Sequence, residues 1–228
     1  MTSIKDISFL NKKALIRVDF NVPFDGDTIY DNSRILAAIP TINYVLENGG
    51  SCIVMSHLGR PKNREKKLSL ARIKRELESL LGLVVIFVED CVGPEVKKAS
   101  QRLMPGQVLL LENLRFYNEE VAGDEKFAEE LSSLADIYIN DAYGTTHRAH
   151  ASTSTIARYF NEKSPGLLLE KEILSLKKVL ESPKKPVTAI VGGAKVSSKI
   201  SIIANMLKVI DNLIICLLYT SPSPRDQL

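Results

Sequence analysis

The chain has 228 residues, of which 45% are hydrophobic and 25% charged, so it can bury a core of ordinary size. Its formal net charge of +3 is too small to indicate a nucleic-acid or membrane partner, and we expect neither. Three cysteines without disulfide or zinc spacing, and the absence of a recognisable signal peptide or membrane-length apolar run, predict a cytoplasmic protein without a metal cage.

Short apolar runs alternate with helical patterns along most of the chain. The runs predict strands at residues 14–20, 51–55, 83–88, 108–111 and 137–139. Apolar spacing predicts helices at residues 34–48, 68–82 and 124–135, with a new helix starting at Pro40. The run at 83–88 is continuous, which predicts a strand buried on both faces. This order predicts an α/β fold, with a mostly parallel sheet and helices on both faces in a Rossmann-like three-layer arrangement.

The carboxyl-terminal part begins with a long predicted helix, from Ser164-Pro165 to about residue 180. A proline-rich break at residues 182–186 follows, then a strand at 187–191 and a helix from Ala194 onward. With one more apolar run at residues 211–215, these elements predict an incomplete second α/β domain.

Basic side chains follow the ends of four predicted strands. They are Arg17 with Asp19 and Asn21, His57 with Arg60, Arg115, and His147 and Arg148 with His150. Parallel strands bring these ends to one edge of the sheet, so we expect the cations to converge on an anion.

The alternative for each arginine is an ion pair with a nearby acid such as Asp19, Glu112 or Asp141. For a single arginine this alternative is favoured, and Arg17 is the one most readily explained as a plain strand residue. For four loops together we favour the anion pocket, with the histidines as donors to the ligand and not as acids or bases.

Two further features carry positive charge at the start of a helix. Arg34 stands at a predicted helix beginning, where the helix dipole is already positive, which suggests a nearby anion. Gly192 and Gly193 separate a strand from a helix that carries Lys195 and Lys199 on one face, which would suit a phosphate. The second pattern matches no phosphate-loop consensus, and a solvated helix start would explain it almost as well.

Five motifs resemble the phosphoglycerate kinase family in order and spacing. They are RVDFNVP (17–23), SHLGRP (56–61), LLLENLRF (109–116), NDAYGTTHRAHAST (140–153) and VGGAKVSSK (191–199). The resemblance covers residues 4–215 and implies a two-domain hinge enzyme that interconverts 1,3-bisphosphoglycerate plus ADP with 3-phosphoglycerate plus ATP, using Mg²⁺.

The resemblance also implies roles for individual residues. It implies a substrate-binding set of Asp19, Phe20, Asn21, Arg34, His57, Leu58, Gly59, Arg60, Arg115, His147 and Arg148. Arg34 and Lys195 would stabilise the phosphoryl group in transfer, and the nucleotide would meet Gly192, Gly193, Ala194, Lys195 and Lys199. No residue is assigned as a metal ligand.

The implied domains are a 3-phosphoglycerate-binding domain at 1–164, an interdomain helix at 165–182 and the first βα unit of the nucleotide domain at 183–215. Residues 216–228 depart from the family pattern and resemble a translated sequencing adapter, so we expect a non-native tail. We therefore expect a monomer that binds 3-phosphoglycerate without useful turnover.

Two rival functions differ in class. A non-catalytic polyanion-binding α/β protein would show steeply salt-dependent affinity without selectivity. A dinucleotide-dependent oxidoreductase should carry GxGxxG after its first strand, and this sequence does not.

Overall fold

The computed structural model describes residues 2–181, 183–192 and 200–216. The chain divides into two compact units, residues 1–172 and residues 173–228. Among the described residues, no helix is long and apolar enough to cross a membrane.

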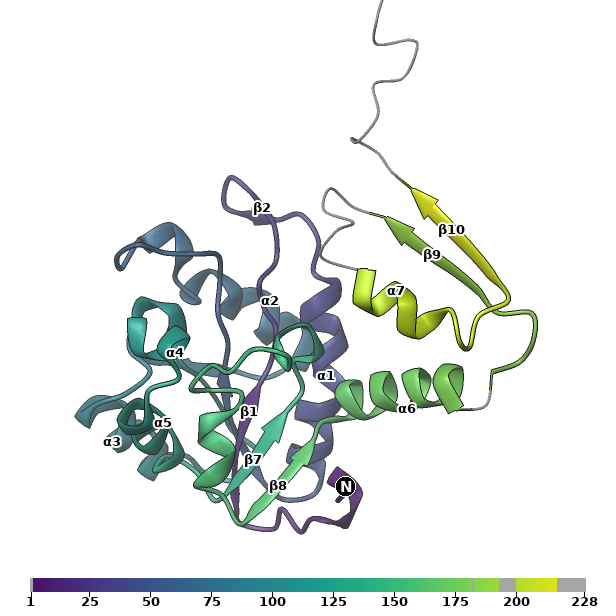
Figure 1. The fold of residues 1–228 in the computed structure, drawn as a ribbon. Coiled ribbons are helices and arrows are strands. Elements are labelled where there is room, and N and C mark those ends of the chain that lie inside the picture. Colours follow the sequence, from purple (N-terminus) through teal and green to yellow (C-terminus); the bar gives the residue numbers. More distant parts are fainter. Residues whose placement is uncertain (1, 182, 193–199, 217–228) are drawn as a thin grey trace, which may run out of the picture. The chain divides into compact units, whose positions relative to one another are not determined.

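A six-stranded sheet forms the centre of the first unit (Figure 1). Its strand order is β5-β6-β4-β1-β7-β8, and every neighbouring pair is parallel. The strands are β1 (Lys13–Arg17), β4 (Ser51–Met55), β5 (Val85–Phe87), β6 (Val108–Leu110), β7 (Ile137–Asn140) and β8 (Glu162–Pro165). A small hairpin of β2 (Phe24–Asp25) and β3 (Thr28–Ile29) lies between β1 and the first long helix. The predicted parallel α/β sheet is confirmed.

Helices cover both faces of this sheet, as predicted. They are α1 (Ser33–Glu47), α2 (Ala71–Leu81), α3 (Pro94–Arg102), α4 (Asn118–Ala122) and α5 (Glu125–Ser132). Helix α6 (Leu167–Glu181) follows β8 and continues past residue 172 into the second unit. Short 3-10 helices occur at Ile4–Asp6, Lys66–Leu68, Leu114–Phe116, Tyr143–Thr145 and Thr155–Arg158. Alternate residues of the strands enter two separate cores, one with α1 and α2 and the other with α3 and α5, because strand side chains point to opposite faces in turn.

Two predictions in this region were wrong. Helix α1 runs unbroken through Pro40, because its buried stripe continues from Ile35 before the proline to Val45 after it. Strand β5 is not buried on both faces: it lies at one edge of the sheet, and Ile86 is 38% exposed.

Strand β8 replaces the predicted helix start at Ser164-Pro165, so α6 begins only at Leu167. This strand forms the other edge of the sheet, where a proline is tolerated because no further strand needs its missing N–H. Helices α3 and α4 were not predicted from the sequence.

The second unit contains β9 (Thr188–Gly192), α7 (Ile200–Met206) and β10 (Asn212–Cys216). The two strands pair in parallel, with Thr188 opposite Asn212. Both strands were predicted to within one residue. The predicted residues Gly193, Ala194, Lys195 and Lys199 lie outside the described residues, as does the tail from residue 217 onward.

Candidate anion-binding site

The loops that follow β1, β4, β6 and β7 meet at the carboxyl edge of the sheet. Backbone hydrogen bonds join them: Val18 N donates to Met55 O at 3.0 Å, and Asp141 N donates to Arg17 O at 2.8 Å. A further bond runs from Leu114 N to Ser56 O at 3.1 Å. The backbones of these loops are therefore held close to one another.

A pocket of about 390 Å³ opens on this edge, and its wall is cationic. It is lined by Arg60, Pro61, Arg115, Tyr117, Asn118, Val121, Arg148 and His150, among which there is no acidic residue. Arg115 is fixed by a 2.7 Å hydrogen bond from Nη1 to the carbonyl oxygen of Gly59. Burial, and then the neighbouring Arg148 and Arg17, lower the pKa of Arg115, which shows how densely positive charge is placed here. Such a wall favours an anionic ligand.

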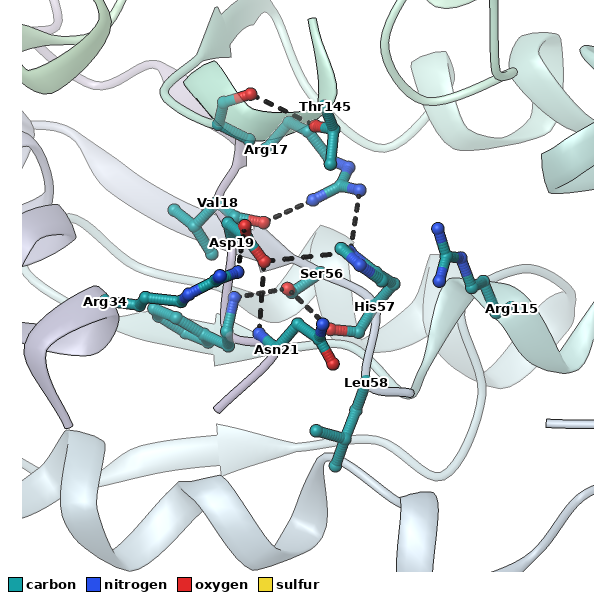
Figure 2. A network of polar contacts seen from close by, with 12 residues as sticks. Arg17, Val18, Asp19, Asn21, Arg34, Ser56, His57, Leu58, Arg115 and Thr145 are labelled. Carbon is teal, nitrogen blue, oxygen red and sulfur yellow. Dashed lines mark hydrogen bonds and ion pairs between the residues drawn. The ribbon is translucent and has the colours of Figure 1, made fainter. Parts of the chain in front are cut away.

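Asp19 and Arg34 form a second part of the same edge (Figure 2). Asp19 Oδ2 accepts a 2.6 Å hydrogen bond from Arg34 Nη1, and both residues line a pocket of about 250 Å³. Asp19 Oδ1 also accepts from Asn21 N at 3.2 Å, while Asn21 Oδ1 accepts from Gly59 N at 2.8 Å. Asn21 thus links this second pocket to the loop that carries Arg60.

His57 is buried and lines neither pocket, but it contacts Arg17 and lies near Asp19. Its Nδ1 is 3.2 Å from Arg17 Nη2 and 4.0 Å from Asp19 Oδ1 (Figure 2). Burial, together with Arg17, Arg115, Arg148 and His150, lowers the pKa of His57 to about 2. The imidazole is therefore neutral at physiological pH, and it can donate a hydrogen bond without adding charge.

Arg17 is more than the plain strand residue that the sequence suggested. It ends β1 as a fully buried side chain, and its Nε donates to Ser152 Oγ at 2.9 Å while Nη1 donates to the carbonyl oxygen of Val18. The strand pattern could have revealed it, because Arg17 shares the face of β1 with the core residue Leu15. A charge in that position needs buried partners.

The remaining predicted residues divide into groups. Phe20 and Leu58 belong to the hydrophobic core, and their backbone amides are bonded to Ser56 Oγ and Asn113 Oδ1. These hydrogen bonds support the loops, and the substrate-binding role of the two residues stays a prediction. His147 is exposed and lines neither pocket, whereas His150, which was not in the predicted substrate set, lines the basic pocket.

The sequence left open that each arginine pairs with a nearby acid. This is so for Arg34, which pairs with Asp19, whereas Glu112 and Asp141 accept other hydrogen bonds. Glu112 accepts hydrogen bonds from Ser69 Oγ at 2.6 Å and from Leu70 N at 2.8 Å. Asp141 Oδ1 accepts from Leu169 N at 3.1 Å, near the start of α6. Burial raises the pKa of Asp141. Neither acid forms an ion pair with an arginine within the part of the chain that the structure describes.

Metal ligands do not gather at this edge. Across residues 2–181, 183–192 and 200–216, no group of three or more histidine, cysteine, aspartate or glutamate side chains could hold a metal ion.

The parallel sheet and the cationic pocket at its carboxyl edge define an α/β protein with a ligand cleft suited to anions. The family model described as phosphoglycerate kinase matches residues 4–218. The chain therefore belongs to the phosphoglycerate kinase family.

Individual relatives agree with this assignment. Phosphoglycerate kinase from Moorella thermoacetica is 56% identical over 214 residues, which are 93% of this chain and 54% of that protein. The Candida maltosa protein is 49% identical over 230 residues. The solved phosphoglycerate kinase from Coxiella burnetii has a TM-score of 0.83 at 37% identity, covering 94% of this chain and 54% of that one. The corresponding structure from Pyrococcus horikoshii has a TM-score of 0.86 at 32% identity. The chain thus spans about half the length of the relatives it matches.

Proposed function

We propose that the full-length enzyme transfers a phosphoryl group between 1,3-bisphosphoglycerate and ADP, giving 3-phosphoglycerate and ATP in glycolysis, and that this polypeptide binds 3-phosphoglycerate without useful turnover. Two facts support this proposal: the relatives bear the name phosphoglycerate kinase, and the carboxyl edge of the sheet carries a dense group of cations. Phosphoryl transfer between two anions depends on positioning and positive charge more than on a general base. A basic pocket without an acidic lining residue suits that chemistry.

The first unit would bind 3-phosphoglycerate. The observation that carries this proposal is the convergence of Arg60, Arg115 and Arg148 on one pocket, although they come from three separate loops. Guanidinium groups match phosphate and carboxylate oxygens with paired donors, so three of them can hold a ligand that has both groups. His57 would add a neutral donor, and Asp19 and Asn21 would orient the ligand and the neighbouring loops.

Arg34 would stabilise the phosphoryl group in transfer. Its side chain is half exposed, and the only described residue that it pairs with is Asp19, so its remaining donors would be available to an incoming anion. Lys195 would act from the nucleotide side, with Gly192, Gly193, Ala194 and Lys199 around the phosphates of ATP or ADP and its Mg²⁺. No residue of this chain is assigned to the magnesium ion.

The organisation of the protein follows from this assignment. Residues 1–164 would bind 3-phosphoglycerate, residues 165–182 would connect the domains, and residues 183–215 would begin the nucleotide domain. The protein would act as a cytoplasmic monomer on small molecules, without nucleic-acid or membrane partners. Residues 216–228 would be a non-native tail, and resequencing of the locus tests that proposal.

Isothermal titration calorimetry with 3-phosphoglycerate tests the substrate proposal. We expect saturable binding to the 228-residue polypeptide, weakened roughly tenfold or more by Arg148→Ala, because hydrogen bonds to charged groups contribute about 1.5–3 kcal/mol each. The matched control is Arg102→Ala, which removes an exposed arginine at the end of α3. Equal affinity in both variants, or displacement by any polyphosphate with a steep salt dependence, would instead favour the polyanion-binding alternative.

A coupled kinase assay on the same polypeptide tests the proposal on turnover. Since the chain spans about half the length of its relatives, we expect binding of 3-phosphoglycerate with turnover far below that of a full-length relative measured alongside. Comparable rates would contradict this expectation.

A further inference from the structure

A buried arginine and a buried glutamate are connected through a single hydroxyl group beneath the anion pocket. Arg17 Nε donates to Ser152 Oγ at 2.9 Å, and Ser152 Oγ lies 2.6 Å from Glu120 Oε1. Arg17 is 1% exposed, and Ser152 and Glu120 are fully buried. Arg17 comes from β1, Glu120 from α4 and Ser152 from the loop after β7, so the connection joins three separate segments.

The direction of each hydrogen bond in this connection is fixed by chemistry. Guanidinium can only donate, and an ionised carboxylate can only accept. The one proton of the Ser152 hydroxyl must therefore point to Glu120, which leaves the oxygen free to accept from Arg17. Burial lowers the pKa of Arg17, and Glu120 opposes that effect, so the carboxylate compensates for the buried positive charge.

The backbone around Ser152 is also held from several directions. Ser152 N donates to Glu120 Oε2 at 2.9 Å, and Ala151 N donates to the carbonyl oxygen of Glu120 at 2.9 Å. The Tyr138 hydroxyl donates to the carbonyl oxygen of Ser152 at 2.8 Å. The hydroxyl that receives Arg17 thus has a fixed position, and it fixes the guanidinium in turn.

A second nitrogen of the Arg17 guanidinium contacts His57. Arg17 Nη2 lies 3.2 Å from His57 Nδ1, and since Nη2 always carries protons, Nδ1 must accept. The competing acceptor, Asp19 Oδ1, lies 4.0 Å from Nδ1, beyond hydrogen-bond distance. The single proton of the neutral ring is therefore on Nε2.

We propose that Glu120 and Ser152 are positioning residues of the anion site: through Arg17 they hold His57 in the tautomer that presents an Nε2–H donor to the ligand. The inference deepens the proposed function, because it takes the ligand to be the phosphorylated acid. It assigns to a buried carboxylate a role in binding an anion.

If Glu120 is a positioning residue, its substitution should change the affinity for the anion in the direction opposite to that expected from its charge. The charged and titratable groups around His57 are Arg17, Asp19, Arg115, Arg148 and His150. If Glu120 affected the ligand only through its negative charge, neutralising it should strengthen anion binding, because the surrounding cations would attract the anion more strongly. If Glu120 acts by positioning, the same change should weaken binding.

The test combines tautomer spectroscopy with calorimetry on the full 228-residue chain. Long-range ¹H–¹⁵N correlation spectra of histidine-labelled protein report which ring nitrogen of His57 carries the proton. We expect Nε2–H in the wild type, and a mixture of tautomers in both Glu120→Gln and Ser152→Ala. In the same variants we expect affinity for 3-phosphoglycerate to fall by roughly tenfold. The control Glu119→Gln removes an adjacent, exposed carboxylate of α4 and should change neither measurement.

Several results would overturn the inference. An Nδ1 proton on His57 in the wild type would do so by itself, without any variant. So would an unchanged tautomer or a higher affinity in a folded Glu120→Gln protein. If that variant does not fold, Ser152→Ala, which removes only the hydroxyl oxygen, decides by the same criteria. If the wild type shows the Nε2 tautomer but does not bind 3-phosphoglycerate, the proposed function fails while the tautomer assignment stands.

Discussion

The carboxylate of Asp19 holds the guanidinium of Arg34 with its Oδ2 2.6 Å from Arg34 Nη1, although Asp19 lies in the loop after β1 and Arg34 is the second residue of α1. An acid inside a site for an anion repels the ligand, so its presence needs a structural reason. The bond aligns Arg34, whose side chain is 50% exposed, over the pocket that the two residues share. Asp19 thus orients Arg34, although its negative charge lowers the positive electrostatic potential of the site.

We predict that Asp19→Ala weakens binding of 3-phosphoglycerate several-fold, even though it removes a negative charge from the site, because Arg34 loses its orientation. The free energy of unfolding should change by less than about 1 kcal/mol, since exposed ion pairs contribute little to stability. Calorimetry and urea unfolding measure the two quantities. Asp25→Ala, in the exposed β2–β3 hairpin, is the control and should leave the affinity unchanged. Tighter binding by Asp19→Ala would show that Asp19 acts only through its charge.

Asn113 connects the loops after β4 and β6 through several hydrogen bonds. Its amide donates to the carbonyl oxygens of Leu58 and Leu68, each at 2.8 Å, and its Oδ1 accepts from the backbone amides of Leu58 and Arg115. Asn113→Ala leaves these buried groups without partners, so we predict destabilisation of about 2–4 kcal/mol. Urea unfolding measures it.

The same variant, if studied below its unfolding transition, should also bind 3-phosphoglycerate more weakly, because Arg115 is positioned through this connection. Asn161→Ala removes an exposed asparagine near β8 and serves as the control for both measurements. Loss of stability without loss of affinity would show that Asn113 stabilises the fold but does not position the ligand-binding residues.

Gly166 precedes α6 at a point where no side chain fits. A Cβ atom added there would overlap the Asp141 carboxylate, which also accepts the backbone amide of Leu169. We predict that Gly166→Ala destabilises the protein by about 1–3 kcal/mol, as overpacking usually does. Gly144→Ala is the control, because its Cβ would meet Asp19 Oδ2 at 3.4 Å, an ordinary contact. Equal unfolding midpoints for the two variants would contradict the prediction.

His57 should make stability depend on pH in the acid range. Its pKa in the folded protein is lowered to about 2 from an ordinary value of 6.5, chiefly by burial. Below pH 6.5 the unfolded chain therefore takes up a proton that the folded chain refuses, so stability falls as pH decreases. The contribution of one such group is at most about 1.4 kcal/mol per pH unit. Above pH 6.5 the group is neutral in both states and contributes no slope.

Urea unfolding of wild type and His57→Gln between pH 7 and pH 4 measures this contribution. We predict a shallower decline in the variant, although His150, whose pKa burial also lowers, still contributes in both proteins. His147→Gln, which removes an exposed histidine, is the control variant for the substitution itself. Parallel curves for wild type and His57→Gln would show that His57 does not remain neutral.

The parallel sheet and its basic edge could be predicted from the sequence because both depend on local patterns. Each buried strand is a short apolar run, and the polar residues that follow it fall on one edge once the strands are parallel. Strand β8 could not be found this way, since Glu162 and Lys163 are exposed and Pro165 resembles the start of a helix. Its place in the sheet comes from pairing with β7, which is a tertiary contact.

The supporting residues of the site escaped prediction for a similar reason. Arg17 and Glu120 are more than 100 positions apart in sequence, and neither forms a recognisable motif with the other. Only the folded chain shows that Ser152 connects them. By contrast, Arg60, Arg115 and Arg148 each lie in the loop that follows a predicted strand, so the sequence pattern could indicate them.

The central claim is that loops from four strands form one site for 3-phosphoglycerate. Amide chemical-shift changes in ¹⁵N-labelled protein during a titration with 3-phosphoglycerate test it most directly. We predict saturable shifts at residues 18–21, 57–60, 113–116 and 145–150, with one shared dissociation constant. The opposite end of the sheet, where Lys12, Asp136 and Glu162 line a pocket of about 480 Å³, should not respond. Shifts concentrated at that opposite pocket, or different dissociation constants for the four loops, would contradict the account.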